Sequence, residues 1–397
     1  MAYSKVVDAD GHILEPRDLW QNYLEAKYQA RGVRFRFNDR GEEFIEVDGK
    51  TFFGSGDGRQ PSGRLGVLGG IGGYPDMDRA KQSARHPFNY MDGAPPGAMD
   101  PHERIEVLDK EGIDVALLYP TIGIIWEEAV ADPGLAAALC RAYNNWLVDF
   151  CKPYPERLFP VAHIPVHDVG DAVVEMRRTA KLGVRGFFLR PDITDNRTLG
   201  HADLDPIWAT AQEMGIPVAP HVVARRFNHP LRDWSASLAS HMNAEETSGV
   251  SALVFNLSML MLPVQACFTA VMTCGVFERF PRLKYVILET GAGWVAHWLE
   301  RMNGKYKVGK SFSPLKEQPE YYFRRQCFVS VEPDERTTPF MVKLLGEDKF
   351  VWASDFPHSD AEYGAVEELK KNIEGLSDTA QRKILGENAA MIYNLPM

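Results

Sequence analysis

The stretch VVDADGHILEP, residues 6–16, leads from a short apolar run directly into three polar side chains, Asp8, Asp10 and His12. Residues two apart in an extended strand point to the same face of that strand. These three side chains therefore share one face of a predicted strand. They form either an exposed acidic turn or the first part of an active site, and the choice depends on what ends the later strands.

Seven further apolar runs follow along the chain, and most of them precede a segment with helical spacing. Such alternation predicts βα units and a parallel sheet. We predict eight strands, at residues 6–10, 115–121, 159–166, 184–191, 216–221, 285–291, 327–333 and 350–355. Helices are expected at residues 101–112, 170–183, 206–215 and 293–302. This pattern indicates an α/β protein of the (β/α)₈ TIM-barrel class.

An open, doubly wound sheet is the alternative fold. It is disfavoured because no GxGxxG motif follows the first strand, and the glycine-rich residues 65–73 follow no clear strand. Residues 33–99 interrupt the βα pattern with a hairpin-like segment that has turns at residues 39–41 and 48–49. We expect a single domain over residues 1–397, with a β-rich insertion at 33–99 in the first βα loop. Barrel enzymes keep their sites at that end of the strands, so the insertion is expected to be a lid or specificity element.

The composition is that of an ordinary globular protein, with 45% hydrophobic and 25% charged residues among 397. The net charge of -10 is spread along the chain and no basic stripe is present, which excludes nucleic acid and anionic membranes as partners. A small-molecule substrate is the expected partner. Five scattered cysteines without CxxC spacing, and the lack of a signal-like N-terminus, indicate a cytoplasmic protein with reduced thiols.

Residues 250–272 are apolar enough to suggest a membrane span. Asn256, Gln265 and the central Pro263 oppose that reading, and no positively charged flank anchors the segment. We expect a buried helix pair instead, at the subunit interface of a homodimer or higher homo-oligomer.

Four of the predicted strands end in a carboxylate or an imidazole. Asp10 and His12 end the first strand, His221 ends the fifth (IPVAPH), Glu289 ends the sixth (YVILETGAGW) and Asp355 ends the eighth (FVWASDFPH). The carboxyl ends of barrel strands meet at one rim, so these side chains should converge. A set of imidazoles and carboxylates suits Zn²⁺, Mn²⁺ or Fe²⁺.

Each of these residues also has a structural alternative. His221 could be a core histidine, Asp355 could stabilise the turn before Pro357, and Glu289 could cap the helix that begins near Gly293. We favour the functional role because the residues end different strands at the same rim.

The motifs VVDADGHILEP, PVAPH, ILETGAGWVAHWLERM and VWASDFPHSD resemble those of the amidohydrolase-related family of metal-dependent TIM-barrel enzymes. That family contains amino-carboxymuconate-semialdehyde and hydroxybenzoate decarboxylases together with several hydrolases. The resemblance spans nearly the whole chain apart from residues 33–99, and it implies that Asp10, His12, His221 and Asp355 hold the metal. The family often has histidine where this chain has Asp10, and the added negative charge favours Mn²⁺ or Fe²⁺ over Zn²⁺.

The sixth strand departs from the family's decarboxylases, which resemble one another in placing a histidine where this chain has Glu289. A carboxylate beside a cation is ionised, so it serves better as a metal ligand or base than as a proton donor. We therefore expect a metal-dependent hydrolase of a small carboxylated or aromatic substrate, with Glu289 as a further metal ligand that could bridge to a second ion. His221 and Asp355 would act in catalysis as well, with Asp355 taking the proton of a metal-activated water.

Two further residues are candidates for substrate binding. Arg190 ends the fourth strand and could pair with a substrate carboxylate. His358 follows Asp355 by three residues and could bind substrate or orient that carboxylate. The alternatives to hydrolysis are a non-oxidative decarboxylase of an aromatic or unsaturated acid and a non-catalytic binding barrel.

Overall fold

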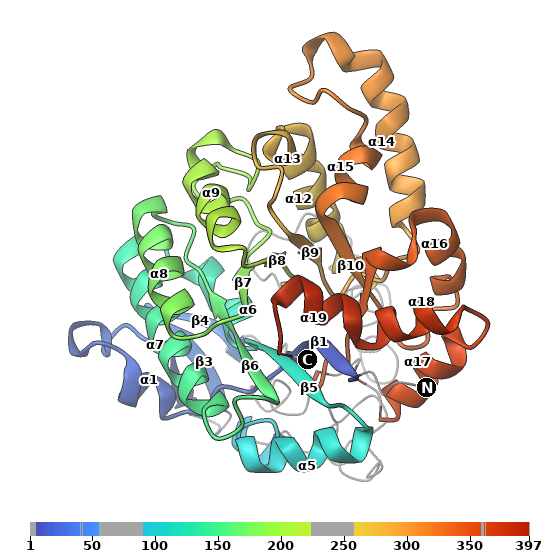
Figure 1. Cartoon of the computed structure of the whole chain (residues 1–397). Coiled ribbons are helices and arrows are strands. Elements are labelled where there is room, and N and C mark those ends of the chain that lie inside the picture. Colours follow the sequence, from blue (N-terminus) through green and yellow to red (C-terminus); the bar gives the residue numbers. More distant parts are fainter. Residues whose placement is uncertain are drawn as a thin grey trace, which may run out of the picture.

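The computed structural model describes residues 5–39, 41, 43–54, 90–223, 258–358, 361 and 363–396. Its main feature is a barrel of parallel strands surrounded by helices (Figure 1). In order around the barrel, the strands are β1 (Val7–His12), β5 (Val115–Tyr119), β6 (Leu158–His163), β7 (Gly186–Leu189), β8 (Val218–Pro220), β9 (Tyr285–Ile287), β10 (Cys327–Val331) and β11 (Phe350–Trp352). All eight predicted strands are present in this order, which confirms the (β/α)₈ prediction.

The barrel closes between β1 and β11 through backbone and side-chain contacts beyond the end of β11. His12 N donates to the carbonyl of Phe356 at 2.7 Å, and Asp355 N donates to the carbonyl of Asp10 at 3.0 Å. Asp8 is fully buried, and its carboxylate accepts from the backbone N and the hydroxyl of Ser354 at 3.0 and 2.6 Å. The first and last strands therefore meet where the polar residues of the opening motif lie.

The longer helices are α5 (Pro101–Glu111), α7 (Pro133–Cys151), α8 (Val169–Lys181), α9 (Asp205–Met214), α12 (Met261–Thr273), α14 (Val295–Gly309), α15 (Pro319–Gln326), α16 (Thr338–Leu345) and α17 (Ala365–Ile373). Shorter helices are α1 (Leu19–Tyr23), α4 (Tyr90–Gly93), α6 (Gly123–Trp126), α13 (Val276–Arg279), α18 (Asp378–Arg382) and α19 (Asn388–Tyr393). The predicted helix at 101–112 shows why the boundaries could be read from the sequence. Asp100 caps its first backbone N–H groups, Pro101 opens the helix, and Gly112 ends it with a φ of 74°.

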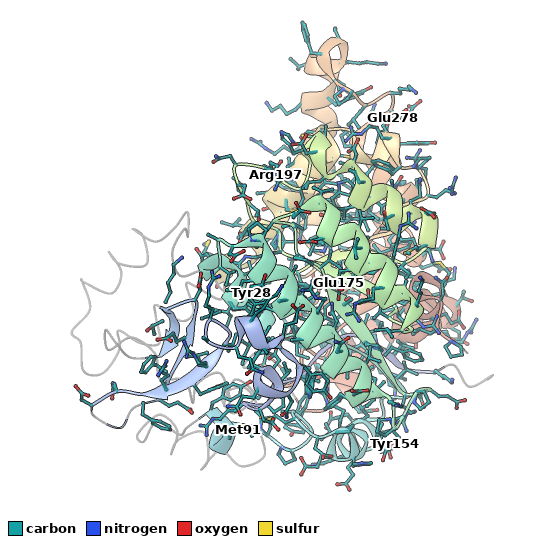
Figure 2. All side chains as sticks on the ribbon, turned by 90° about the vertical axis from the view of Figure 1, so that its left-hand side faces the viewer. Tyr28, Met91, Tyr154, Glu175, Arg197 and Glu278 are labelled. Atoms are coloured by element: carbon teal, nitrogen blue, oxygen red, sulfur yellow. The ribbon has the colours of Figure 1, made fainter. Side chains whose placement is uncertain are left out.

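The segment after β1 forms a small antiparallel sheet of β2 (Arg34–Phe37), β3 (Glu43–Val47) and β4 (Lys50–Gly54). This confirms the β-rich insertion, while its residues 55–89 lie outside the described part of the chain. Arg31 ties the sheet to the barrel, because its guanidinium reaches Asp48 and Asp132 at 2.7 Å each. Tyr28 lies over the start of α7 (Figure 2), where a side chain at Gly134 would come within 2.6 Å of the tyrosine hydroxyl.

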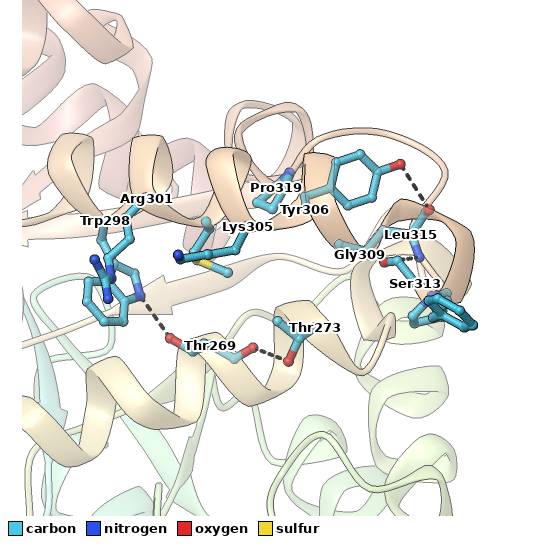
Figure 3. A pocket seen from close by; sticks show the side chains of 13 residues that line it. Thr269, Thr273, Trp298, Arg301, Lys305, Tyr306, Gly309, Ser313, Leu315 and Pro319 are labelled. Carbon is cyan, nitrogen blue, oxygen red and sulfur yellow. Dashed lines mark hydrogen bonds between the residues drawn. The ribbon is translucent and has the colours of Figure 1, made fainter.

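Helix α12 occupies the second part of the apolar stretch at residues 250–272. It packs against α14, where Trp298 donates to the hydroxyl of Thr269 at 2.8 Å (Figure 3). Within the described residues, none of the helices combines the length and the apolar character that a membrane crossing requires. Residues 250–257 lie outside the described part. None of the five cysteines, all of which lie in the described part of the chain, forms a disulfide.

Candidate metal centre

The side chains of Asp10, His12, His221 and Asp355 meet at the carboxyl-terminal end of the barrel, and we call them the His12–His221 cluster. The two Nε2 atoms of His12 and His221 are 3.1 Å apart. Asp10 Oδ2 lies 3.2 Å from His221 Nε2, and Asp10 Oδ1 lies 3.6 Å from His12 Nε2. Asp355 Oδ1 lies 3.3 Å from His12 Nε2. All four residues are buried.

Backbone carbonyls fix which ring nitrogen carries the proton in both histidines. Nδ1 of His12 lies 2.9 Å from the carbonyl oxygen of Pro120, and Nδ1 of His221 lies 2.7 Å from that of Val222. A carbonyl oxygen only accepts, so Nδ1 donates in each ring and Nε2 carries a lone pair. Two lone pairs that face each other at 3.1 Å repel unless a cation or a proton lies between them.

Asp10 adds a negative charge to this arrangement. It is fully buried, and neither carboxylate oxygen accepts a hydrogen bond from any residue that the structure describes. Buried polar atoms without hydrogen bonds are rare and point to a missing partner. Two imidazole nitrogens beside carboxylate oxygens form a donor set that suits Mn²⁺, Fe²⁺ or Zn²⁺. The residues of the cluster therefore fit a divalent cation.

The protonation of the two imidazoles agrees with this interpretation. Burial lowers the pKa of His12 well below its usual range, and the neighbouring His358 and His221 lower it further. His12 is thus neutral, the form that binds metals. Burial also acts to lower the pKa of His221, but the facing carboxylate of Asp10 outweighs burial and raises it. When no cation is bound, the raised pKa favours the protonated form of His221.

The backbone at the ends of β9 and β11 turns in an unusual way. Glu289 and Asp355 have φ values of 51° and 53°, in the left-handed region that non-glycine residues seldom adopt. Such residues cost about 1–3 kcal/mol each and collect at functional sites. Glu289 N donates to the hydroxyl of Ser330 at 3.1 Å, which holds the turn in place.

Glu289 does not lie among the residues that surround the paired Nε2 atoms. Its Oε2 lies 3.4 Å from Nδ1 of His221, whereas Asp10 approaches Nε2 of the same ring. The compact group of possible ligands around His221 consists of Asp10, His12 and His221. The structure therefore places Glu289 beside Nδ1 of His221, outside the compact group formed by Asp10, His12 and His221.

His358 does lie beside the cluster. Its Nδ1 is 3.0 Å from Asp355 Oδ1, and its ring stacks on that of His12 with 3.9 Å between the ring centres. The hydroxyl of Thr121 lies 2.9 Å from Nε2 of His358. The sequence reasoning assigned no role to Thr121, although it ends the second predicted strand.

A second buried cluster lies at the ends of β6 and β7, and we call it the His163–Arg190 cluster. It consists of Glu127, Glu128, His163, His167, Arg190 and Asp192. Nε2 of His163 lies 2.9 Å from Glu127, while Arg190 is paired with Asp192 at 2.5 Å and with Glu128 at 3.8 Å. Arg190 also donates to the carbonyl of Ile124 at 3.1 Å.

Arg190 was predicted to bind substrate, and the structure places it inside this network with 2% of its surface exposed. Sequence reasoning missed the cluster as a whole. His163 lies within the third predicted strand, and its position near a strand end was the signal that could have identified it. Phe188 separates the two clusters, with its ring 4.7 Å from that of His163 and 6.0 Å from that of His221.

A pocket of about 440 Å³ lies elsewhere, between α12 and α14 (Figure 3). Its walls include Trp298, Met302 and Tyr306, with Arg301 and Lys305 beside them. None of the residues lining this pocket belongs to either cluster, so it does not contribute to the candidate metal centre.

Comparison with known proteins identifies relatives of the whole chain. A family model with the description Amidohydrolase matches residues 7–395. The 2-amino-3-carboxymuconate-6-semialdehyde decarboxylase of Dictyostelium discoideum is 23% identical over 303 residues, which cover 75% of this chain and 77% of that protein.

Solved structures agree on the fold. A crystal structure of an amidohydrolase from Mycobacterium avium subsp. paratuberculosis K-10 has a TM-score of 0.76 and 21% identity, covering 99% of this chain and 100% of that one. A 5-carboxyvanillate decarboxylase from Novosphingobium aromaticivorans, with bound manganese and 3-methoxy-4-hydroxy-5-nitrobenzoic acid, has a TM-score of 0.64 and 20% identity, covering 99% and 97%.

These findings overturn the expectation of a hydrolase. The relatives named for a reaction on a defined substrate are decarboxylases. The expectation of hydrolysis rested on Glu289 acting as a metal ligand or base, and the structure places that carboxylate 3.4 Å from Nδ1 of His221, outside the compact group of Asp10, His12 and His221. The prediction of hydrolysis from Glu289 was therefore wrong.

Proposed function

This chain belongs to the amidohydrolase family, and from that premise we propose that it is a metal-dependent, non-oxidative decarboxylase of a small aromatic or unsaturated acid. One observation carries the proposal: the Nε2 atoms of His12 and His221 lie 3.1 Å apart beside the buried carboxylate of Asp10. The decarboxylases among the relatives support the reaction class, and the manganese in one of them supports the metal.

We assign Asp10, His12, His221 and Asp355 as the residues that hold one divalent ion, with manganese as the first choice because two of the four are carboxylates. When bound, such an ion supplies positive charge that fixes the substrate carboxylate and an adjacent hydroxyl and stabilises negative charge that develops on them. Glu289 is assigned to orient His221, since it faces Nδ1 of that ring.

Asp355 is assigned to proton transfer. Its Oδ1 contacts the imidazoles of His12 and His358, so we assign the transferred proton to Oδ2. Asp355 takes up a proton from water at Oδ2 and delivers it to the substrate carbon that bears the carboxylate, and a π electron pair of the substrate forms the new C–H bond. The bond between that carbon and the carboxylate then breaks, its electron pair restores the double bond or aromatic ring, and carbon dioxide leaves. Asp355 is left as a carboxylate and takes up its next proton from water.

The small sheet of β2–β4 is proposed to limit access to this site. Lys50, at the start of β4, donates to the carbonyl of Ala129 at 2.8 Å. Ala129 lies in the segment that follows β5 at the carboxyl-terminal end of the barrel. The insertion is thus tied to the rim that carries the His12–His221 cluster.

The test is release of carbon dioxide from a panel of hydroxybenzoates, carboxyvanillate-like acids and unsaturated dicarboxylic acids. The purified protein is expected to release carbon dioxide from at least one of them, to lose that activity on chelation and to regain it with Mn²⁺. Substituting His12 by alanine should abolish both activity and bound manganese. Activity that survives complete removal of metal would contradict the proposal.

A further inference from the structure

Thr121, Glu15 and His358 form a buried chain of hydrogen bonds that ends on the proposed proton-transfer residue. Glu15 belongs to the opening motif, and its carboxylate accepts the backbone N–H groups of Thr121, Ile122 and Gly123 at 3.2, 2.7 and 3.0 Å. Glu15 and Thr121 are both fully buried. The carboxylate therefore fixes the backbone that carries the Thr121 hydroxyl.

The contacts of His358 set the direction of each hydrogen bond along this chain. The carboxylate of Asp355 only accepts, so the 3.0 Å contact makes Nδ1 of His358 the donor. In the neutral ring Nε2 then carries the lone pair, and the Thr121 hydroxyl at 2.9 Å donates to it. The same imidazole stacks on His12 at 3.9 Å, which restricts its tilt.

We infer that Thr121 is a positioning residue for decarboxylation: its hydroxyl holds the His358 ring in the orientation that directs Nδ1–H at Oδ1 of Asp355. This inference rests on the proposed role of Asp355 in proton transfer. With Oδ1 held by His358, Oδ2 keeps a fixed direction for delivering the proton. Thr121 contacts neither a proposed metal ligand nor the reacting atoms, so it acts through His358.

The physical consequence of removing the hydroxyl follows from its partner. Thr121→Val preserves the shape of the side chain and removes the hydrogen bond to Nε2. Nε2 then faces a methyl group, so the imidazole loses the contact that fixes this edge of the ring and can rotate away from the carboxylate of Asp355. Loss of partners that orient metal-site residues typically reduces activity about 10–100-fold.

The test compares wild type, Thr121→Val, Thr121→Ser and the control Thr338→Val. Thr338 is also a fully buried threonine, and its hydroxyl has no hydrogen bond within the described part of the chain. Thr121→Val should lower kcat about 10–100-fold while KM and manganese content stay near wild type, and Thr121→Ser should restore kcat. An unchanged kcat in Thr121→Val, an equal loss in Thr338→Val, or no rescue by serine would overturn the inference.

A second readout does not depend on any substrate. Crystal structures of the Zn²⁺-loaded wild type, Thr121→Ser and Thr121→Val proteins show the orientation of the His358 ring. Wild type and Thr121→Ser should keep Nδ1 of His358 within hydrogen-bond distance of Oδ1 of Asp355, and Thr121→Val should show the ring displaced from it. The same ring orientation in all three proteins would overturn the inference. If the wild type releases no carbon dioxide, the proposed function fails while the ring orientation still decides the role of Thr121.

Discussion

The two buried clusters at the rim of the barrel contain similar residues, but they differ in how their negative charge is compensated. The His163–Arg190 cluster includes its own permanent cation, since Arg190 pairs with Glu128 and Asp192. In the His12–His221 cluster, the carboxylate of Asp10 faces only imidazoles within the described residues. Asp10 therefore suits a cation taken from solution, whereas the negative charge of the His163–Arg190 cluster is already compensated by Arg190, and this difference distinguishes a metal centre from a structural ion-pair network.

The largest effect is expected for Asp355→Asn, which removes the proposed proton carrier from the His12–His221 cluster. We expect kcat for carbon dioxide release to fall about 10²–10⁴-fold, the usual contribution of general acid–base catalysis. Steady-state kinetics with manganese-loaded protein measures it. Asp192→Asn is the matched substitution in the other cluster and should keep most of the activity. Equal losses in both variants would remove the functional distinction between the clusters.

Arg190→Ala should break the second cluster without affecting metal binding. It leaves buried carboxylates uncompensated, so we expect the free energy of unfolding to fall by about 3–5 kcal/mol. Chemical denaturation measures this loss. Arg177→Ala is the control, because Arg177 pairs with Glu213 at 2.7 Å on the surface, where ion pairs contribute little. Loss of manganese in folded Arg190→Ala would show that the clusters are not independent.

The affinity for manganese should depend on pH through His221. The facing carboxylate of Asp10 raises the pKa of His221 despite burial, so the metal-free protein holds a proton there below that raised pKa. Metal binding must release this proton, so affinity should fall as the pH falls, about tenfold per unit for one proton.

Calorimetric titration with Mn²⁺ in buffers of different ionisation enthalpy measures the number of protons released. His163→Gln alters only the other cluster and should leave this number unchanged. If binding releases no proton below the ordinary histidine pKa of about 6.5, the assignment of His221 is wrong.

The smallest effect is expected for Glu289→Gln. Because Glu289 faces Nδ1 of His221, its carboxylate lies outside the proposed ligand set. Elemental analysis should therefore find one manganese ion per chain in both the variant and the wild type. Two ions in the wild type that fall to one in the variant would restore a bridging role for this residue.

Much of the fold could be predicted from the sequence because its signals are local. Apolar runs followed by helical spacing identified all eight strands, and a capping aspartate and a terminal glycine bounded α5. The convergence of Asp10, His12, His221 and Asp355 followed from the barrel, because the ends of its strands share a rim.

The details that decide the chemistry were not local. The side of the His221 ring that Glu289 faces depends on a left-handed backbone turn, and nothing in the sequence LETGAGW specifies it. The roles of Thr121 and Glu15 depend on contacts that span over 100 residues of sequence. From the sequence alone, Arg190 could be a substrate-binding residue or part of a structural ion pair. Its pairing with Glu128 and Asp192 is visible only in the structure.

The most direct test of this account is anomalous diffraction from crystals of the manganese-loaded protein, measured on both sides of the manganese absorption edge. We expect one anomalous peak per chain, between the Nε2 atoms of His12 and His221 and the carboxylates of Asp10 and Asp355. No peak is expected in the His163–Arg190 cluster, where Arg190 already supplies the positive charge. A crystal with saturating manganese and no peak at the His12–His221 cluster would contradict the central claim.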